Sequence, residues 1–562
     1  MDLRTLAVRL RLAVQLAAGA VVVLLAGWSV WAVALAYSPT PFHDQWGSVH
    51  LWRVIREQGF DPALLFAQHN EHRLVFPRLV FLADFAWFQG RNILNLVAIG
   101  AVQAAAAALY LRAADLRRTG LPGLLAAALA CGLMFSLTQW ENFFWGFQVQ
   151  FVGVFAAAGW AIWLFCRGGL DPDGVRWPAL GGAFALLTVA AFSLSNGLTA
   201  GLAMAAVVLL VRGRPAVAGL ALAATALLLA IYLKGYQPVE AHSPARFALE
   251  RPVDYVRYVL TYLGNVWSGG GPRTALAAGL AGALGAAAMA LVLLRAPRPD
   301  APRAAMLGIV VFVGMTAGLT ALGRLSFGVE QALAPRYATP VAHFWAAQAV
   351  YWMLTLAQAP RPRLQAAVAF AAAAGLAVLL DLQPKAMDHL FRTHDRVLAG
   401  SSAIVGEVED PQALQALFPD PEVIQALTPF MREQRLGPYA ATPAIAVGRP
   451  LTLPVAEGGA CRGRLDSLEP APEGAAWRAH GWGWDRRQGE AFDHVALVDS
   501  TGRVVGIALG HAARPDVLKA LRRPGAEGAG WIGVLEPPQG EVVAYGLAQD
   551  GRACEIGRRE VG

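Results

Sequence analysis

Residues 112–176 read RAADLRRTGLPGLLAAALACGLMFSLTQWENFFWGFQVQFVGVFAAAGWAIWLFCRGGLDPDGVR. Two apolar runs, 121–139 and 145–166, lie between arginine-rich ends, and each has roughly the 20 residues needed to cross a hydrocarbon core. Short loops rich in arginine stay on the cytoplasmic side of a membrane. The two runs are therefore predicted to form a transmembrane hairpin with the segment 140–142 at its outer tip.

The same alternation of connectors extends along the chain to Gln383. Arginines occur in one set of connectors, near Arg11, Arg118, Arg176, Arg214, Arg295 and Arg363. The other set is polar and comprises 43–46, 68–73, 138–145, 195–197, 235–272 and 323–340. The positive-inside rule predicts that the first set is cytoplasmic and the second set is outside. Any chemistry is therefore expected on the extracytoplasmic face.

The predicted fold class is a polytopic α-helical membrane protein with about eleven transmembrane helices. These are assigned to 12–37, 92–111, 121–139, 145–166, 178–194, 198–212, 215–234, 273–294, 303–322, 340–358 and 364–382. The first run is too long for the apolar core of a signal peptide and is predicted to be an uncleaved helix. The arginines before the first span predict a cytoplasmic N-terminus. An odd number of crossings then predicts a periplasmic C-terminal domain, in a bacterial inner membrane.

The composition agrees with this class. The 562 residues are 56% hydrophobic and only 15% charged, which is unusual for a soluble enzyme. The formal net charge of +7 comes largely from arginines in the predicted cytoplasmic loops. No basic face with interleaved aromatic side chains is visible, so no nucleic-acid partner is expected.

The long first outer loop, 38–91, contains one segment of mixed character. Residues 74–90 are apolar but short, and they include Arg78 and Asp84. A crossing here would invert every later loop and place the arginine-rich connectors outside. The segment is therefore predicted to be an interfacial helix along the membrane surface, with a companion helix over 49–59.

The chain changes character after the predicted membrane domain, 1–382. Residues 383–450 have a soluble helical pattern and are predicted to be a linker region. Residues 451–562 contain short alternating runs with turn signals, which predict a soluble β-sandwich. Cys461 and Cys554 bracket this domain in an oxidising compartment and are expected to form a disulfide. Its tryptophans are expected in the core, with a carbohydrate platform as the alternative; they are Trp477, Trp482, Trp484 and Trp531.

His43 and Asp44 directly follow the first predicted helix. A carboxylate at the mouth of a membrane cavity is placed to accept a proton from a hydroxyl group. A helix-end acid satisfied by headgroups is the alternative. A divalent-cation site is chemically feasible but lacks tight ligand spacing; it would use His43, Asp44, His69 and His72.

The segment 69–73 is a run of five polar residues in the same outer loop. Its charged members Glu71, His72 and Arg73 strengthen the functional interpretation of His43 and Asp44, because they lie in the same loop. A solvated surface run is the alternative.

Two further outer turns contain candidates for substrate binding. Glu141 and Asn142 occupy the tip of the predicted hairpin, where a helix cap is the alternative. Asn196 lies in the turn 195–197 between two short predicted spans. Short spans are tolerated where they line a wet cavity.

The strongest candidate group flanks the outer connector 323–340. Arg324 ends one predicted helix, Arg336 and Tyr337 precede the next, and Glu330 lies between them. Arginines at membrane depth are costly unless an anion lies close by, and a guanidinium fork suits a phosphate. An internal ion pair of Glu330 with either arginine is the alternative.

These features together resemble the GT-C glycosyltransferases, which include the protein O-mannosyltransferases and the lipid A aminoarabinose transferases. The shared pattern covers the architecture of 1–382: many helices, and a long first outer loop with an acidic residue directly after the first helix. Asp44 matches the position of the family's first-loop catalytic carboxylate, and Arg336 resembles a late-loop residue that binds the carrier phosphate. This chain lacks the usual pair of adjacent carboxylates, which leaves Glu71 and Glu141 as alternatives for the second acid.

The resemblance implies an inverting transfer of a sugar from a polyprenyl-phosphate donor to an acceptor hydroxyl of a glycan or lipid. Asp44 is expected to deprotonate the acceptor, and Arg336, with Arg324, to stabilise the departing phosphate. The resemblance also implies that His72 or Arg73 orients the donor or the acceptor. No cofactor is expected. A transporter or flippase of a lipid-linked or anionic substrate is the alternative from another class, although the predicted spans have few charges near their middle. A lipid-linked glycan ligase would show a similar pattern.

Overall fold

The computed structural model describes residues 3–239, 246–269, 271–296, 300–358, 361–443, 445–456, 459–472 and 476–561. Parts of the predicted outer loop 235–272 therefore lie outside the described residues. The chain divides into two compact units. The first comprises Met1–Val30, Pro62–Leu79 and Leu96–Ala386, and the second comprises Trp31–Asp61, Val80–Asn95 and Met387–Gly562. The predicted boundary after Leu382 lies close to the division at Ala386.

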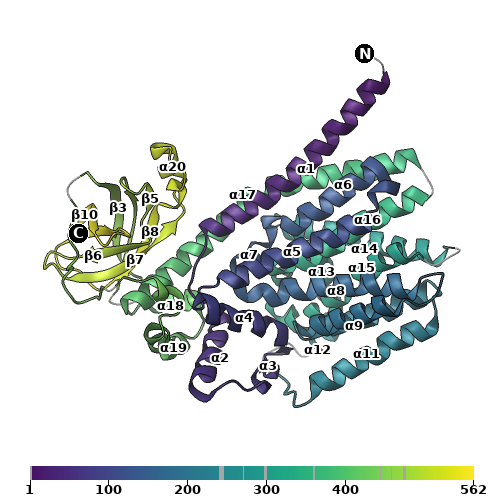
Figure 1. The fold of residues 1–562 in the computed structure, drawn as a ribbon, viewed down its shortest axis with the longest axis horizontal. Helices are drawn as coiled ribbons and strands as arrows, with labels where there is room; N and C mark the ends of the chain where they lie inside the picture. Colours follow the sequence, from purple (N-terminus) through teal and green to yellow (C-terminus); the bar gives the residue numbers. More distant parts are fainter. Residues whose placement is uncertain are drawn as a thin grey trace. The chain divides into compact units, whose positions relative to one another are not determined.

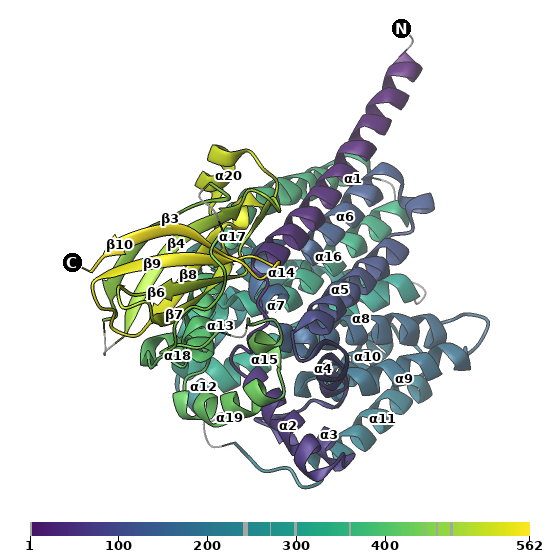
Figure 2. The same cartoon turned by 60° about the vertical axis from the view of Figure 1, so that its left-hand side comes forward.

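The first unit is a bundle of helices that run side by side (Figure 1 and Figure 2). Three of its long helices, α1, α5 and α17, extend beyond the unit. The long helices are α1 (Leu3–Leu35), α5 (Ile93–Ala113), α6 (Leu116–Phe135), α8 (Val149–Gly169), α9 (Trp177–Ala191), α10 (Thr199–Leu210), α11 (Pro215–Leu233), α14 (Pro272–Leu294), α15 (Ala301–Arg324), α16 (Ala338–Gln358) and α17 (Pro362–Gly406). In the described part of the chain, each of the eleven predicted spans coincides with one of these helices. A further amphipathic helix, α13 (Pro252–Gly264), packs on α14. It lies in the segment 235–272, for which the sequence pattern predicts a loop.

Eight of the described helices are long and apolar enough to cross a membrane, so the chain has the character of a membrane protein. Three helices that match predicted spans fall outside this set. The helices α9 and α10 are apolar but contain only 15 and 12 residues, and α16 is less apolar. Eleven crossings and their orientation therefore stay predictions.

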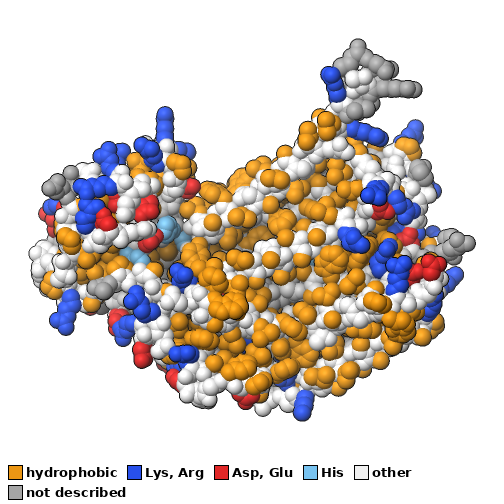
Figure 3. All heavy atoms as spheres, viewed as in Figure 1, with side chains coloured by type: hydrophobic (Ala, Val, Ile, Leu, Met, Phe, Trp, Pro, Cys, Tyr) orange, Lys and Arg blue, Asp and Glu red, His pale blue; other side chains and the backbone are white. Residues whose placement is uncertain are grey.

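The surface of the bundle is apolar over most of its length. Figure 3 shows hydrophobic side chains spread over the helices of the first unit, with Lys and Arg gathered at one end of them. Val97, Leu227 and Leu284 are each more than 60% exposed. Apolar surface of this extent is suited to hydrocarbon rather than to water.

A buried polar network connects α5, the end of α6 and the start of α16. The Gln139 side chain, in the turn η1 (Leu137–Gln139), donates to the carbonyls of Leu133 (2.8 Å) and Met134 (3.0 Å). Its Oε1 accepts from Gln103 Nε2 (2.9 Å) and from Thr339 Oγ1 (2.6 Å). Polar groups inside an apolar bundle need such partners because no water replaces them. The network fixes the turn that leads into α7 (Trp140–Phe144).

The segment 74–90 forms α4 (Val75–Phe88), which has 14 residues. At about 1.5 Å per residue this helix is roughly 21 Å long, shorter than a hydrocarbon core of about 30 Å. Asp84 accepts hydrogen bonds from the backbone N–H groups of Asn92 (2.8 Å) and Leu94 (2.7 Å), where α5 begins. Its carboxylate therefore has a local structural partner, and an interfacial position of α4 stays a prediction.

The helical part of the second unit combines parts of the predicted first outer loop with the chain after α17. The helix α2 (Gln45–Gln58) packs on α19 (Pro421–Glu433), and α18 (Pro411–Leu417) precedes α19. Arg53 donates to the carbonyl of Ala426 (3.3 Å), and the backbone N–H of His43 donates to the carbonyl of Leu417 (2.6 Å). The predicted companion helix over 49–59 is thus present as α2, which begins four residues earlier.

The β-part of the second unit is a single antiparallel sheet of eight strands among the described residues, in the order β10-β9-β6-β7-β8-β4-β3, with β5 beside β4. The strands are β3 (Cys461–Pro470), β4 (Trp477–Asp485), β5 (Glu490–Ala491), β6 (His494–Val498), β7 (Val504–Ala512), β8 (Gly530–Leu535), β9 (Glu541–Leu547) and β10 (Ala553–Glu560). The two ends of the sheet meet, because β10 also packs against β3. The domain is therefore barrel-like, and the predicted sandwich of two separate sheets is not confirmed.

The four tryptophans of this domain belong to its apolar clusters. Trp531 is 1% exposed and lies in the main core with Trp477 at its margin, while Trp484 is buried with Trp482 beside it in a smaller cluster. Buried indole rings offer no open face for sugar stacking. Trp484 and Trp531 are therefore core residues as predicted, whereas Trp477 and Trp482 are only half-buried, and the carbohydrate platform stays an alternative prediction.

The sheet is attached to the preceding helices by polar contacts. Asp410 accepts from the backbone N–H of Ala413 (3.0 Å) as the cap of α18, and it pairs with Arg478 of β4 (2.8 Å). Ser402 of α17 donates to the carbonyl of Ile507 and accepts from the N–H of Val534, both at 2.7 Å. The predicted linker region is thus packed on the sheet rather than extended.

Cys461 and Cys554 form a disulfide with a Cα–Cα distance of 6.2 Å. It joins β3 to β10, the two ends of the sheet, across 93 residues of sequence. Such a bond restricts a long loop in the unfolded chain and typically contributes about 2–5 kcal/mol.

We expect the double substitution Cys461→Ser/Cys554→Ser to lower the free energy of unfolding of the β-domain by about 2–5 kcal/mol. Limited proteolysis at increasing temperature, read from fragments of residues 451–562, measures this loss. Dithiothreitol should reproduce the effect in the wild-type protein and add nothing in the double variant. Equal protease resistance of both proteins would contradict a stabilising role.

Candidate functional site

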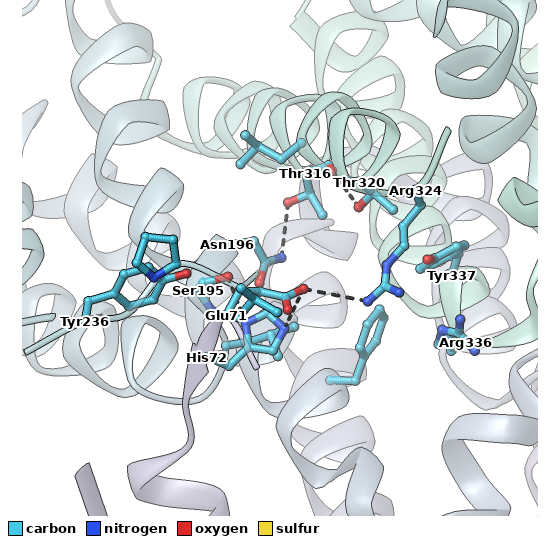
Figure 4. Close-up of a pocket in the computed structure, with 16 residues that line it drawn as sticks. Glu71, His72, Ser195, Asn196, Tyr236, Thr316, Thr320, Arg324, Arg336 and Tyr337 are labelled. Carbon is cyan, nitrogen blue, oxygen red and sulfur yellow. Dashed lines mark hydrogen bonds and ion pairs between the residues drawn. The ribbon is translucent and has the colours of Figure 1, made fainter. Parts of the chain in front are cut away.

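The first unit contains a cavity of about 490 Å³ where several helix ends and turns meet. Its polar lining comes from separate segments of the sequence: Glu71, His72, Ser195, Asn196, Tyr236, Thr316, Thr320, Arg324, Arg336 and Tyr337 (Figure 4). Apolar side chains complete the wall, among them Phe151, Leu194 and Leu319. Six residues predicted from the sequence therefore share one cavity, namely Glu71, His72, Asn196, Arg324, Arg336 and Tyr337.

The connector between α15 and α16 brings Arg324 and Arg336 to the same cavity. It consists of three short turns, η5 (Leu325–Phe327), η6 (Val329–Leu333) and η7 (Pro335–Tyr337). Asn265 of the turn η4 (Asn265–Trp267) donates to the carbonyls of Ala332 (2.9 Å) and Ala334 (3.1 Å). These bonds hold the connector folded back, so that both arginines face inward rather than away from the bundle.

Arg336 forms the tightest ion pair of the cavity. Its guanidinium donates to Glu141 Oε1 (2.8 Å), and its backbone N–H donates to Glu141 Oε2 (3.2 Å). Burial by itself lowers the pKa of Arg336, but the Glu141 carboxylate and the Tyr337 side chain together more than offset this and raise the pKa above its ordinary value. The guanidinium is therefore a permanent positive charge, with 29% of its side chain still exposed.

Asn142 supports this arrangement from behind the cavity. Its side-chain N–H₂ group donates to the carbonyl of Arg336 (2.8 Å) and to Thr339 Oγ1 (2.6 Å), and the residue is fully buried. Asn142 was predicted to bind substrate, but its position gives it a structural role. Glu141 likewise reaches the site through Arg336 and does not itself line the cavity.

Arg324 has a looser partner in Glu71. The distance from Arg324 Nη2 to Glu71 Oε1 is 3.7 Å, and the same carboxylate oxygen lies 3.5 Å from His72 Nε2. His72 Nδ1 contacts Ser195 Oγ at 2.9 Å. Figure 4 shows this sequence of contacts, from Arg324 through Glu71 and His72 to Ser195. The sequence pattern did not predict Ser195 as a lining residue, although it belongs to the predicted polar turn 195–197.

A two-stranded turn presents Glu71 and His72 to the cavity. The strands β1 (Gln68–His69) and β2 (His72–Arg73) pair antiparallel. Arg73 donates to the carbonyls of Tyr232 (2.7 Å), Lys234 (2.6 Å) and Phe66. These bonds occupy its guanidinium, and the residue as a whole is 7% exposed. Arg73 therefore fixes the turn to the end of α11 instead of orienting a substrate as predicted.

The turn 195–197 requires its glycine. A side chain at Gly197 would place a Cβ atom 2.1 Å from the carbonyl oxygen of Ala190, so only glycine allows this close return of the chain. The turn directs Asn196 into the cavity, where its side-chain N–H₂ group donates to Thr316 Oγ1 (3.2 Å). The other amide atom, Asn196 Oδ1, is buried and accepts no hydrogen bond among the described residues.

One face of α15 supplies a row of polar groups to the cavity. Thr316, Thr320 and Arg324 follow one another at intervals of four residues, which places them on the same side of a helix. All three line the cavity. The two threonines were missed because they lie inside a predicted span, yet their spacing from Arg324 is a signal that the sequence contains.

Glu330 does not pair with either arginine. It is exposed in η6, and in the described part of the chain Arg324 pairs with Glu71 and Arg336 with Glu141. The alternative of an internal pair with Glu330 is therefore wrong, because the acid closest in sequence is not the closest in space. Glu330 is also absent from the cavity lining, where it was predicted to contact substrate.

His43 and Asp44 belong to the second unit. Asp44 precedes α2, is half-buried and makes no side-chain cap to that helix. Its carboxylate has neither a hydrogen bond nor an ion pair among the described residues. His43 adopts a positive φ of 47°, with its ring against Phe42. The convergence of Asp44 with the cavity stays a prediction.

The described residues contain no group of three His, Cys, Asp or Glu side chains arranged to hold a metal ion. The alternative divalent-cation site has residues in both units, with His43 and Asp44 in the second and His69 and His72 in the first, and it stays a prediction. Comparison with known proteins gives no further guidance, since neither a protein-family model nor a curated protein matches the chain. The chemistry of the site rests on its own residues.

The two ion pairs of the cavity are expected to differ in strength. Glu141 and Arg336 are 14% and 29% exposed and lie 2.8 Å apart, whereas Glu71 and Arg324 are 31% and 33% exposed and lie 3.7 Å apart. A double-mutant cycle with Glu141→Gln and Arg336→Gln should give a coupling energy of about 1–3 kcal/mol. The cycle with Glu71→Gln and Arg324→Gln should give less than about 1 kcal/mol. Unfolding of the purified protein in detergent measures both, and a reversed order would contradict the structure.

Proposed function

We propose that the chain is an integral membrane glycosyltransferase that uses a polyprenyl-phosphate-linked sugar. The observation that carries the proposal is the shared cavity of Arg324 and Arg336, beside a carboxylate and a histidine, in a bundle of apolar helices. Two guanidinium groups suit a phosphate, and the neighbouring apolar wall suits a prenyl chain. The resemblance to the GT-C glycosyltransferases adds the reaction type.

In this proposal the arginines receive the phosphate that leaves during transfer. The acceptor oxygen attacks the anomeric carbon and forms the new glycosidic bond, while the bond between that carbon and the phosphate oxygen breaks with inversion. The polyprenyl phosphate departs with the electron pair of the broken bond. Arg336, held in place by Glu141, and Arg324 stabilise the negative charge on it.

A carboxylate must take the proton of the acceptor hydroxyl. We assign this role to Asp44, as the resemblance implies, and its carboxylate has no hydrogen-bonding or ionic partner among the described residues that would compete for the proton. Glu71 is assigned a positioning role. Its carboxylate lies between Arg324 and His72 and holds Arg324 until a phosphate replaces it.

Asp44→Asn should lower the rate of transfer by about 10²–10⁴-fold, because the amide accepts no proton. Transfer of radiolabelled hexose from polyprenyl phosphate, by the purified protein with an extract of acceptor glycans and lipids, measures the rate. Glu57→Gln, at an exposed acid on α2 in the same loop, is the matched control and should retain activity. An Asp44→Asn variant that is inserted in the membrane and fully active would contradict the assignment of Asp44 as the base.

Arg336→Gln should reduce transfer by about 10²–10³-fold, since one donor to the developing charge is lost. The double variant Glu141→Gln/Arg336→Gln separates this effect from the cost of an unpaired Glu141: it should regain stability but not activity. Glu330→Gln is the control for the connector and should leave the rate unchanged. Recovery of transfer in the double variant would show that Arg336 acts only through folding.

A further inference from the structure

A second cavity of the first unit, of about 300 Å³, is lined by arginines that the proposed reaction does not use. Its charged and polar lining comprises Arg112, Asp115, Arg118, Arg167, Asp300 and Gln358. It lies where α5 and α8 end, α15 begins and α16 ends. These are the helix ends that the positive-inside rule predicts to be cytoplasmic.

The two cavities of the first unit lie at opposite ends of α15. Pro302, in its first turn, lines the second cavity, and Arg324, its last residue, lines the first. The helix has 24 residues, which correspond to roughly 36 Å at about 1.5 Å per residue. A hydrocarbon core is about 30 Å thick. The two cavities are therefore separated by about the distance between the two headgroup layers of a bilayer.

The second cavity has an excess of positive charge. Asp115 pairs with Arg118 (3.9 Å), and Asp300 pairs with Arg303 (3.3 Å). The remaining arginines of the lining, Arg112 and Arg167, have no acidic partner among the described residues. Arg167 lies over the ring of Trp163, at 5.9 Å from its centre. In the first cavity, by contrast, both arginines are paired with glutamates.

Helix dipoles explain only part of this arrangement. Arg112 and Arg167 are in the last turns of α5 and α8, where the partial negative charge of a helix end favours a cation. Both arginines are exposed and line the same hollow, so a single anion can contact two guanidinium groups there. An anion in the hollow would compensate both. Leu354 and Ala357 also line it and provide an apolar side.

We propose that this second cavity binds the phosphate of an anionic lipid headgroup, in the leaflet opposite to the first cavity. Arg112 and Arg167 contact the phosphate oxygens, and the wall of Leu354 and Ala357 packs against the carbon atoms next to the headgroup. Basic pockets between transmembrane helices bind acidic lipids in this manner. Free phosphate is also an anion, but it has no carbon atoms that would pack against Leu354 and Ala357. The site is independent of the proposed transfer reaction.

The test is a titration of the purified full-length protein in neutral detergent with fluorescent phosphatidylglycerol. Saturable binding is expected, and Arg112→Gln/Arg167→Gln should weaken it about thirtyfold, which corresponds to about 1 kcal/mol per arginine. The matched control is Arg361→Gln/Arg363→Gln. It removes the same charge from exposed residues at the start of α17, outside the cavity, and should leave binding unchanged.

Further titrations test which ligand binds and in which of the two cavities it binds. Phosphatidylcholine, which has no net charge, should bind at least about tenfold more weakly, and inorganic phosphate at equal concentration should not displace phosphatidylglycerol. Arg336→Gln, in the first cavity, should not alter this binding. If Arg112→Gln/Arg167→Gln does not fold, the single variants Arg112→Gln and Arg167→Gln are titrated, each with about a fivefold loss expected.

Three results would overturn the proposal: unchanged binding by the Arg112 and Arg167 variants, an equal loss in the control variant, or equal binding of phosphatidylcholine. Displacement by equimolar inorganic phosphate would assign the site to free phosphate instead of a lipid. Loss of binding in Arg336→Gln alone would place the lipid in the first cavity.

Discussion

A guanidinium group at the end of an apolar helix bundle needs an anion close to it, because desolvation of an uncompensated charge costs several kcal/mol. Glu141 meets this need for Arg336 through both its carboxylate oxygens, one on the guanidinium and one on the backbone N–H. Asn142 binds the carbonyl of the same residue. Charge compensation and the conformation of the turn before α16 thus depend on two neighbouring residues of α7.

This interaction extends into the bundle. Asn142 also binds Thr339, which donates to Gln139, and Gln139 accepts from Gln103 on α5. Each member is buried, so the hydrogen bonds have no water to replace them. The position of Arg336 is therefore specified by contacts that reach from the cavity to α5.

Arg324 is held less tightly, and this asymmetry suits a site that exchanges anions. Its contact to Glu71 is 3.7 Å, and Glu71 shares its carboxylate with His72. A phosphate that enters the cavity competes more easily with this pair than with Glu141 and Arg336. In the proposed function Arg336 is a fixed anchor, and Arg324 changes its partner from Glu71 to the substrate. The second cavity, at the other end of α15, is lined by Arg112 and Arg167, which have no acidic partner in the described part of the chain, and is suited to a resident anion.

The sequence by itself determined the long apolar helices, because apolar runs of about 20 residues have few other stable arrangements in a membrane. It also determined that the turn 195–197 and the two ends of the connector 323–340 are polar. Tertiary structure decided the partners: Arg324 and Arg336 pair with Glu71 and Glu141 and not with Glu330, and Arg73 binds main-chain carbonyls rather than the cavity. It likewise decided that the strands of the C-terminal domain curl into one barrel-like sheet, since alternation gives the faces of a strand but not its neighbours. The secondary structure of a segment depends mainly on its neighbours in the sequence. The pairing of charges and the closure of a sheet depend instead on distant segments that meet only when the chain packs.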